Sequence, residues 1–259
     1  MKCRICNSES TEQFSTLVLR KYTVRYFLCP NCSFLQTEEP YWIEEAYRSP
    51  INTSDTGVVA RSVFFSKIVT SVICLHLDKD KKFLDYGGGY GLFTRLMRDV
   101  GFDYFWSDPF TQNLFAKGFE FDGRGKTFEL LTCFETFEHF TDPMKEIGSM
   151  TKLSSNIFFS TEMLPIPVPS LSDWYYYAPE HGQHVSFYSS KTFHYIAQQF
   201  GFTYHTNGSD LHFFTKEKIS PAGFRFIIRY GKFLYLVLKK RMKSRTGPDS
   251  ILTAKAGGS

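Results

Sequence analysis

The hydrophobic pattern between residues 80 and 217 alternates between two periods. Short apolar runs predict strands, and apolar positions spaced three and four residues apart predict helices. Asp142 followed by Pro143 marks a helix start, and Asn207-Gly208 predicts a hairpin turn. Alternating strands and helices indicate a mostly parallel sheet with right-handed crossovers and an antiparallel strand from the closing hairpin. The predicted strands end at residues 84, 108, 133 and 161, and the predicted helices cover 92–100, 142–153 and 189–201.

Two other segments have helical patterns. Residues 57–77 carry an apolar stripe at helical spacing after a polar loop. Residues 224–243 mix aromatic, aliphatic and basic side chains, and as a helix they would be amphipathic. Such a helix suits either an anionic membrane surface or packing on the body with a solvated basic face. The residues beyond 245 predict a disordered tail.

Composition and charge limit the class of protein. The chain has 259 residues, of which 42% are hydrophobic, so it can form one sizeable domain with an accessory part. No apolar run approaches 18 residues and the N-terminal MKCRIC lacks an apolar signal region, so we expect a cytoplasmic protein. Residues 1–220 have a net charge of −4 and residues 221–259 a net charge of +8. The basic charge therefore describes the tail and not the main fold.

Four of the six cysteines form two Cys-x-x-Cys pairs. Each pair places two thiolates on one side of a short loop, and two such loops make a tetrahedral site suited to structural Zn²⁺. The segment FSTLVLRKYTVRYFLC between the pairs predicts a hairpin that brings them together. A ribbon of this size has almost no core of its own, so zinc would supply folding energy. The predicted zinc ligands are Cys3, Cys6, Cys29 and Cys32.

A glycine-rich turn between a predicted strand and a predicted helix indicates nucleotide binding. The sequence KKFLDYGGGYGLFTRL places an acid, Asp85, before glycines that allow a tight turn and close approach of a ligand. The next predicted strand ends at Asp108, where a carboxylate can bond ribose hydroxyls. Strand, acid, glycine loop and helix in this order are a more specific signal than the glycines alone.

These motifs resemble those of class I S-adenosylmethionine (SAM) methyltransferases. FLDYGGGYG is similar to their first motif, FWSDP to their ribose-binding strand, and LLTCFETFEHFTDP to their fourth-strand segment. The resemblance implies a Rossmann-like, doubly wound, mostly parallel sheet of seven strands. The segment FEFDGRGK, where the third strand is expected, is short. The implied SAM-binding residues are Asp85, Gly87, Gly89, Gly91, Asp108 and Phe134.

The cysteine module and the loop DWYYYAPEHGQHVSFYS, residues 173–189, narrow the resemblance. Together they are similar to bacterial methyltransferases of sugar and surface-polysaccharide pathways, some of which act on nucleotide sugars. The Tyr-Glu-His motif is one residue longer here, and the large C-terminal domain of those relatives is missing from this sequence. The resemblance implies a small sugar or glycan-precursor acceptor and leaves O- or C-methylation open.

The same loop supplies the predicted catalytic residues. A methyl acceptor must lose a proton, and histidine beside a carboxylate suits that task near pH 7. We expect His181 to be the base, assisted by Glu180 and Tyr177, with His184 as the second choice. Ordinary half-buried loop residues are the competing interpretation. Glu138 with His139, and Tyr47 on the acceptor side, are further candidates with structural alternatives.

The predicted organisation has four parts and one main alternative function. An RNA methyltransferase could use the ribbon and the basic tail, but acids follow the basic residues of the ribbon and no Asn/Asp-Pro-Pro-Tyr motif occurs. A binding module without catalysis is disfavoured by the intact glycine loop. The partner is therefore expected to be a small molecule, with membrane contact through residues 224–243.

The four predicted parts of the chain are a zinc ribbon (1–40), a helical connector (41–78), a SAM-binding domain (79–217) and a basic helix with a disordered tail (218–259).

Overall fold

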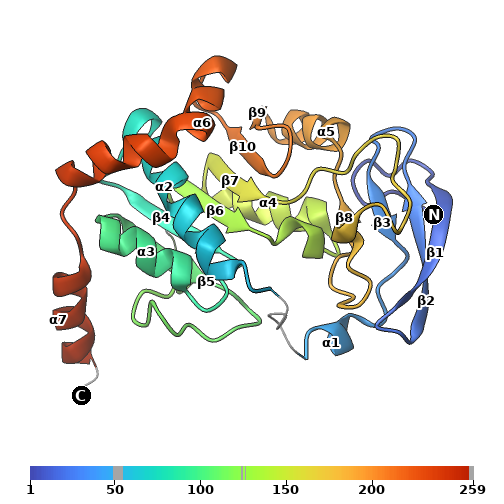
Figure 1. The fold of residues 1–259 in the computed structure, drawn as a ribbon, viewed down its shortest axis with the longest axis horizontal. Helices are drawn as coiled ribbons and strands as arrows, with labels where there is room; N and C mark the ends of the chain where they lie inside the picture. Colours follow the sequence, from blue (N-terminus) through green and yellow to red (C-terminus); the bar gives the residue numbers. More distant parts are fainter. Residues whose placement is uncertain (49–54, 124, 126, 257–259) are drawn as a thin grey trace. The chain divides into compact units, whose positions relative to one another are not determined.

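The computed structural model of the protein describes residues 1–48, 55–123, 125 and 127–256. The chain divides into two compact units, whose elements are labelled in Figure 1. Each unit is built from segments that are far apart in the sequence. Unit 1 comprises Met1–Asn52, Glu135–Thr151 and Phe159–Thr215, and unit 2 comprises Thr53–Phe134, Lys152–Phe158 and Lys216–Ser259.

Unit 1 contains an antiparallel sheet in which the cysteine-bearing segment pairs with a strand from late in the chain. The predicted hairpin is present as β1 (Thr11–Val18) and β2 (Tyr22–Leu28). Strand β3 (Leu35–Thr37) pairs with β2 on one side and with β8 (Ser186–Phe187) on the other. Residues 1–40 therefore share their sheet with residues 186–187. The predicted division at residue 40 stays a prediction.

The core of that sheet is aromatic. Tyr26, Trp42, Trp174, Tyr177 and Phe187 belong to one buried cluster. The indole of Trp42 donates to the carbonyl of Gly182 at 2.8 Å, which links the N-terminal segment to the 173–189 loop. The other elements of unit 1 are α1 (Ile43–Ala46), η1 (Phe137–His139), η2 (Tyr175–Tyr177), α5 (Ser190–Phe200), β9 (Thr203–Thr206) and β10 (Leu211–Thr215).

Unit 2 contains the strands that carry the glycine motif. Strand β4 (Lys82–Tyr86) pairs in parallel with β5 (Asp103–Ser107) and with β6 (Leu130–Phe134). The chain turns at the glycines after β4 and continues into α3 (Leu92–Val100), as the sequence predicted. The connection from β6 leads through α4 (Pro143–Leu153), where Asp142 accepts from the amide of Lys145, to β7 (Asn156–Ser160).

The larger sheet has six strands among the described residues, in the order β5-β4-β6-β7-β10-β9. The prediction of seven strands was wrong, because the expected third strand is reduced to a single parallel bridge between Trp106 and Glu120. Two backbone bonds support that bridge, from Trp106 to the carbonyl of Phe119 and from Phe121 to the carbonyl of Trp106. Residues 124 and 126, in the same short segment, lie outside the described residues. Because β9 and β10 are antiparallel, the sheet is mixed.

Helices α2 (Val58–His76) and α6 (Pro221–Leu238) pack against each other in unit 2 (Figure 1). Their backbones approach closely at Gly231, where an added Cβ would lie 3.0 Å from the Cδ1 of Ile68. The hydroxyl of Ser71 donates to the carbonyl of Gly231 at 2.9 Å. This packing buries one face of α6 and leaves its opposite face exposed. Residues 49–54, part of the polar loop predicted before α2, lie outside the described residues.

Helix α2 has the length and composition of a membrane-spanning helix, with a hydropathy of 1.8 and 44% of its residues buried. Arg61 and Lys67 interrupt α2, so it reaches this hydropathy without an uninterrupted apolar run of 18 residues. Core helices have the same properties, and α2 buries Phe65, Ile68 and Val72 while packing against α3 and α6. Composition alone therefore does not assign a membrane span to α2.

The C-terminal segment is helical and docked, so the prediction of a disordered tail was wrong for α7 (Thr246–Ala256). After α6 and η3 (Lys239–Arg241), α7 brings Asp249 to Arg98 of α3. Both carboxylate oxygens accept from the guanidinium at 2.8 Å, and both side chains are at most 3% exposed. Burial raises the pKa of Asp249, but Arg98 and Arg95 more than offset this, so its pKa lies below the ordinary value.

We expect Asp249→Ala to destabilise the protein by about 1.5–3 kcal/mol, because the buried guanidinium of Arg98 would lose two charge-assisted hydrogen bonds and keep those to Asp103 and the carbonyl of Tyr104. Urea unfolding measures the change. Asp80→Ala is the control, since the Lys79–Asp80 pair is exposed and should contribute nothing measurable. An unchanged unfolding free energy for Asp249→Ala would mean that α7 does not dock in solution.

Candidate functional site

The glycine loop in unit 2 has the backbone that the sequence predicted for a nucleotide-binding turn. Gly87, Gly89 and Gly91 have φ values of 68°, 53° and 84°, a region that other residues rarely adopt. At Gly91 an added Cβ would also lie 2.5 Å from the Oδ1 of Asn113. The loop therefore requires glycine for conformation and for space, and it leads directly into the N-terminus of α3.

Asp85 is a buried carboxylate beneath this loop. It is 2% exposed and accepts hydrogen bonds from the hydroxyls of Thr94 and Thr132, both at 3.1 Å. Burial raises the pKa of Asp85 to about 7, although both hydroxyl bonds act in the opposite direction. Its side chain ties β4 to α3 and β6, which fixes the start of the loop.

Asp108 fixes the middle of the loop from the end of β5. Its Oδ2 accepts from the amide of Gly89 at 2.9 Å, and its Oδ1 accepts from the amide of Phe110 at 2.8 Å. The carbonyl of Gly89 accepts from the Trp106 indole and the Thr111 hydroxyl. The predicted acids and glycines are thus brought together in unit 2 at the carboxyl ends of β4 and β5.

Phe134 lies at the end of β6 among other rings of unit 2. It stacks on Phe65 with ring centroids 4.4 Å apart and meets Phe93 edge-on at 4.8 Å. The structure places this predicted SAM contact in an aromatic group with α2 and α3. It supplies an apolar surface and no polar group.

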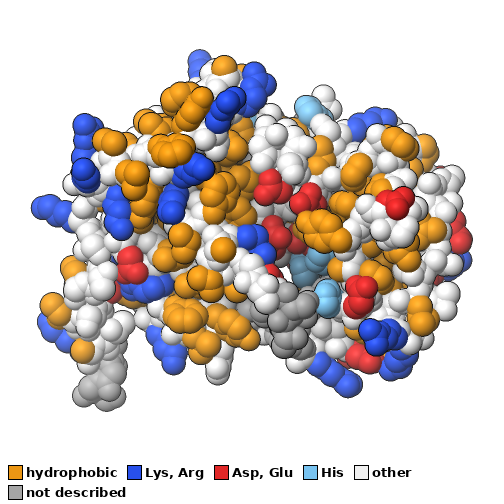
Figure 2. Space-filling view, viewed as in Figure 1, with side chains coloured by type: hydrophobic (Ala, Val, Ile, Leu, Met, Phe, Trp, Pro, Cys, Tyr) orange, Lys and Arg blue, Asp and Glu red, His pale blue; other side chains and the backbone are white. Residues whose placement is uncertain are grey.

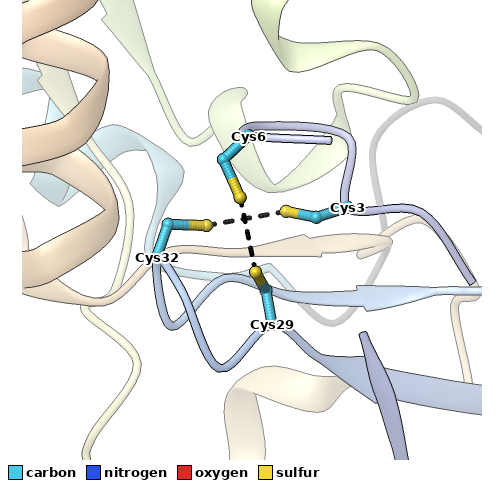
Figure 3. A group of neighbouring side chains, drawn as sticks. All are labelled: Cys3, Cys6, Cys29 and Cys32. Carbon is cyan, nitrogen blue, oxygen red and sulfur yellow. Dashed lines mark hydrogen bonds between the residues drawn. The ribbon is translucent and has the colours of Figure 1, made fainter. Parts of the chain in front are cut away.

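The four predicted cysteine ligands converge on one point in unit 1 (Figure 3). Their sulfur atoms lie within 4.8 Å of one another, with Cys3 and Cys32 at 3.5 Å and Cys6 and Cys29 at 3.4 Å. Sulfurs bound to tetrahedral Zn²⁺ at about 2.3 Å would be about 3.8 Å apart. The donor set and the spacing therefore fit a structural zinc ion.

The two cysteine loops have the same backbone geometry. In each loop the residue after the second cysteine has a left-handed conformation, with φ of 59° at Asn7 and 57° at Ser33. The amides of these residues donate to the carbonyls of Cys3 and Cys29, both at 2.9 Å. The amide of Ile5 also donates to the sulfur of Cys3 at 3.4 Å. Backbone hydrogen bonds therefore shape both loops, and each loop presents two sulfurs to the same centre.

The three consecutive tyrosines of the 173–189 loop have different surroundings because they form the 3₁₀ helix η2. Tyr175 is 77% exposed and its hydroxyl donates to Glu162. Tyr177 is buried, and its hydroxyl donates to the carbonyl of Pro169 at 2.9 Å. Tyr176 is buried beside the hydroxyl of Thr161, 3.2 Å away. The predicted assisting residue, Tyr177, thus lies in the aromatic core, while Tyr176 lies among ionisable side chains.

Two histidines from separate segments of unit 1 come together. The ring centroids of His139 on η1 and His184 in the loop are 5.1 Å apart. The Nδ1 of His184 donates to the carbonyl of Tyr176 at 2.7 Å, which leaves Nε2 without the proton. The Nδ1 of His139 lies 2.9 Å from the hydroxyl of Tyr47, and Glu138 Oε1 lies 3.9 Å from its Nε2. The candidates Glu138, His139, Tyr47 and His184 therefore form one cluster, the histidine cluster.

Burial keeps the imidazoles of this cluster neutral. It lowers the pKa of His184, and it lowers the pKa of His139 still further, with His184 adding to that effect. Burial raises the pKa of Tyr176 well above the ordinary value, and the nearby carboxylates of Glu138 and Glu135 add to it. At neutral pH the cluster therefore offers uncharged ring nitrogens as proton acceptors or metal ligands.

The first-choice catalytic residues lie in the same loop. Glu180 is exposed, and the amide of His181 donates to the carbonyl of Ala178 at 3.1 Å. His181 is close enough to His184 to influence the pKa of that ring. The roles predicted for Glu180 and His181 stay predictions.

Glu135 is a candidate that sequence reasoning missed. It follows β6 directly and has a left-handed backbone with φ of 49°, which is costly for a residue with a side chain. Ser160 donates to its carboxylate through Oγ, and its amide donates to the Ser160 carbonyl at 3.1 Å. Its charge also raises the pKa of His184. The sequence does carry a signal for Glu135, because this acid comes just after the strand predicted to end at residue 133, within the segment LLTCFETFEHFTDP.

A methyltransferase domain family matches residues 64–207, more than half of the chain, so the protein belongs to this family. It is a SAM-dependent methyltransferase with a Rossmann-like α/β fold and a mixed sheet. The comparison with curated proteins returned no match.

Solved structures are similar at low identity. The plantazolicin methyltransferase BpumL in complex with SAH is 12% identical, with a TM-score of 0.50 over 79% of this chain and 91% of that one. An O-methyltransferase family protein from Burkholderia thailandensis is 13% identical, with a TM-score of 0.47 over 61% and 57%. Magnesium protoporphyrin IX methyltransferase from Synechocystis PCC 6803 is 14% identical, with a TM-score of 0.43 over 69% and 98%. At 12% identity, the similarity to BpumL supports the fold of this chain alone.

Gly91→Ala should weaken SAM binding strongly, because the new Cβ meets Asn113 and the positive φ disfavours alanine. Calorimetric titration with SAM measures the loss. The matched control is Gly148→Ala in α4, where an added Cβ meets nothing closer than 3.6 Å. Normal SAM affinity in Gly91→Ala would show that the loop does not bind the cofactor.

Proposed function

We propose that the protein transfers a methyl group from SAM to a small acceptor of the sugar or glycan-precursor type. The observation that carries this proposal is the histidine cluster of unit 1, because SAM supplies the electrophile when bound but the acceptor must lose a proton. Asp85, Gly87, Gly89, Gly91 and Asp108 of unit 2 would hold SAM, with Phe134 as an apolar neighbour. The acceptor is a hydroxyl group or a carbon beside a carbonyl.

The acceptor proton would leave at the histidine cluster and not at His181. The Nε2 of His184 is available because Nδ1 donates to a backbone carbonyl, which fixes both the tautomer and the orientation of the ring. A buried neutral imidazole accepts a proton more readily when a carboxylate stands nearby, and Glu135 and Glu138 supply that charge. Tyr176 would orient the acceptor through its hydroxyl.

An open surface pocket in unit 1 would suit a sugar. Its volume is about 590 Å³, and aromatic, hydroxyl and carboxylate side chains line it. Aromatic rings pack on the apolar faces of sugars, while hydroxyls and carboxylates bond the sugar hydroxyls. Glu180, predicted as a catalytic residue, would serve here as an acceptor contact. The lining residues include Ser170, Ser172, Trp174, Tyr175 and Glu180.

His184→Ala should lower methyl transfer about 10²–10⁴-fold while SAM affinity stays unchanged, because a positioned base is lost and the SAM residues are not. Transfer from labelled SAM to a panel of nucleotide-linked sugars and keto sugars, beside a SAM titration, measures both quantities. His194→Ala on the exposed face of α5 is the matched control. Near-normal transfer in His184→Ala and His139→Ala, with loss in His181→Ala, would return the base to His181.

The four cysteines would hold one structural Zn²⁺. All four tetrahedral positions would be filled by thiolates, so this ion would have a folding role and no open position for chemistry. The matching backbone of the two cysteine loops supports this assignment.

Cys29→Ser should release this zinc and unfold the segment around β1, β2 and β3, because metal binding supplies much of its folding energy. Metal analysis and amide hydrogen exchange measure the two effects. Cys74→Ser is the control, since Cys74 lies on α2 outside the cluster. A folded protein purified without chelator and containing no zinc would contradict the assignment.

The exposed face of α6 would contact an anionic membrane surface. Phe226, Phe233, Leu236 and Val237 are 52–61% exposed, and Figure 2 shows hydrophobic and basic side chains together over α6. No acidic residue occurs between Pro221 and Pro248, so the segment complements anionic headgroups. The exposed cations are Arg225, Arg229, Lys232, Lys239, Lys240, Arg241 and Lys243.

The double variant Phe233→Ser, Leu236→Ser should lose sedimentation with phosphatidylserine vesicles, and the parent protein should lose it at high salt. Leu17→Ser, at a similarly exposed position on β1, is the matched control. Equal sedimentation of the double variant and the parent would rule out α6 as the contact.

A further inference from the structure

The histidine cluster gathers the donor atoms of a metal site. One ligand atom each from Glu138, His139 and His184 lies within 4.8 Å of the other two. Two imidazoles and one carboxylate are a donor set that suits Zn²⁺ and other divalent transition metals. The three residues come from η1 and from the loop before β8, and both segments belong to unit 1.

Both imidazoles carry the outer contacts that metal-binding histidines require. A ligating histidine usually donates its second ring N–H to an oxygen, which fixes the tautomer and aims the other nitrogen at the metal. The Nδ1 of His184 is 2.7 Å from the carbonyl of Tyr176, and the Nδ1 of His139 is 2.9 Å from the hydroxyl of Tyr47. At His184 this leaves Nε2 to bind a cation, and at His139 Nε2 has the same role when Nδ1 donates to the Tyr47 hydroxyl.

The burial of the three side chains grades from inside to outside. The Glu138 side chain is 1% exposed and the His139 side chain is 18% exposed. A charged ligand would thus lie at the base of the cluster, and the two partly exposed imidazoles would lie nearer the surface. Backbone bonds fix the two segments together, since the amide of Val185 donates to the carbonyl of Glu138 at 2.9 Å.

We propose that Glu138, His139 and His184 bind a divalent transition-metal ion, separate from the four-cysteine site. Three protein ligands leave a coordination position open, as in catalytic sites, whereas four thiolates fill a structural site. A cation there would attract the oxygen of an acceptor hydroxyl or carbonyl and lower the pKa of the group that loses its proton. With an ion bound at Nε2, His184 would hold the metal and would not act as the base, so the acceptor proton would pass to solvent. That role rests on the proposed methyl transfer, but metal binding itself does not.

Metal content and a Co²⁺ titration test the proposal on the full-length protein. Protein saturated with Zn²⁺ and then desalted should contain two ions per chain, and the double variant His139→Ala, His184→Ala should contain one. Co²⁺ in the cluster should give a visible spectrum without the intense sulfur charge-transfer band of the four-cysteine site. The variant Tyr47→Phe keeps the ring but loses the hydroxyl that bonds His139, so the affinity of the histidine cluster for Co²⁺ should fall about 10–100-fold.

Two controls separate the possible outcomes. His194→Ala should retain two ions, and SAM titration of each variant reports whether unit 2 is still folded. One ion in the parent protein, or two ions in both the parent and the double histidine variant, would overturn the proposal. A parent protein that holds one ion but binds SAM and transfers methyl groups would refute the metal site alone, whereas a parent protein that does not bind SAM would refute the proposed function.

Discussion

The backbone of Val185 connects the main parts of unit 1. Its amide donates to Glu138 on η1, its carbonyl accepts from the amide of Thr37 on β3 at 3.1 Å, and Ser186 next to it donates to the carbonyl of Phe140. Buried backbone groups need such partners, so Val185 and the two-residue strand β8 that follows it have little freedom to shift. His184 immediately precedes Val185, and fixing the strand fixes the ring against His139. The geometry of the histidine cluster therefore depends on hydrogen bonds that involve no catalytic side chain.

Unit 2 fixes its glycine loop by a different means, with buried polar side chains. Asp85 anchors the loop to two hydroxyls from below, and Asp108 bonds the amide of Gly89 from the neighbouring strand. A cofactor that needs the Asp108 carboxylate for its ribose would compete with those amide bonds, so the loop is already shaped for a nucleoside but not rigidly closed. Asp85 holds the loop from a buried position, and this burial raises its pKa.

Local patterns in the sequence predicted the features that depend on neighbouring residues. The order of strands and helices, the hairpin between the cysteine pairs, the glycine turn and the Asp142 cap all follow from residues a few positions apart. The error at the C-terminus concerns a contact between distant residues. Asp249 pairs with Arg98, 151 positions away, and this pair orders a tail whose composition predicted disorder. Nor can sequence tell which of three consecutive tyrosines faces ionisable groups, since the turn of η2 decides it.

The arrangement of β3 gives the cysteine cluster a role beyond its own segment. Cys29 and Cys32 stand between β2 and β3, and β3 pairs on its other side with β8, next to Val185. Folding energy supplied at the cysteines would thus reach the histidine cluster through a strand of only three residues. Short strands have few bonds to lose, so local opening at the cysteines would free Thr37 and with it one of the partners of Val185. An N-terminal segment that bound a metal would therefore be coupled to the histidine cluster by backbone pairing, and it would need no contact with either substrate to affect the proposed reaction.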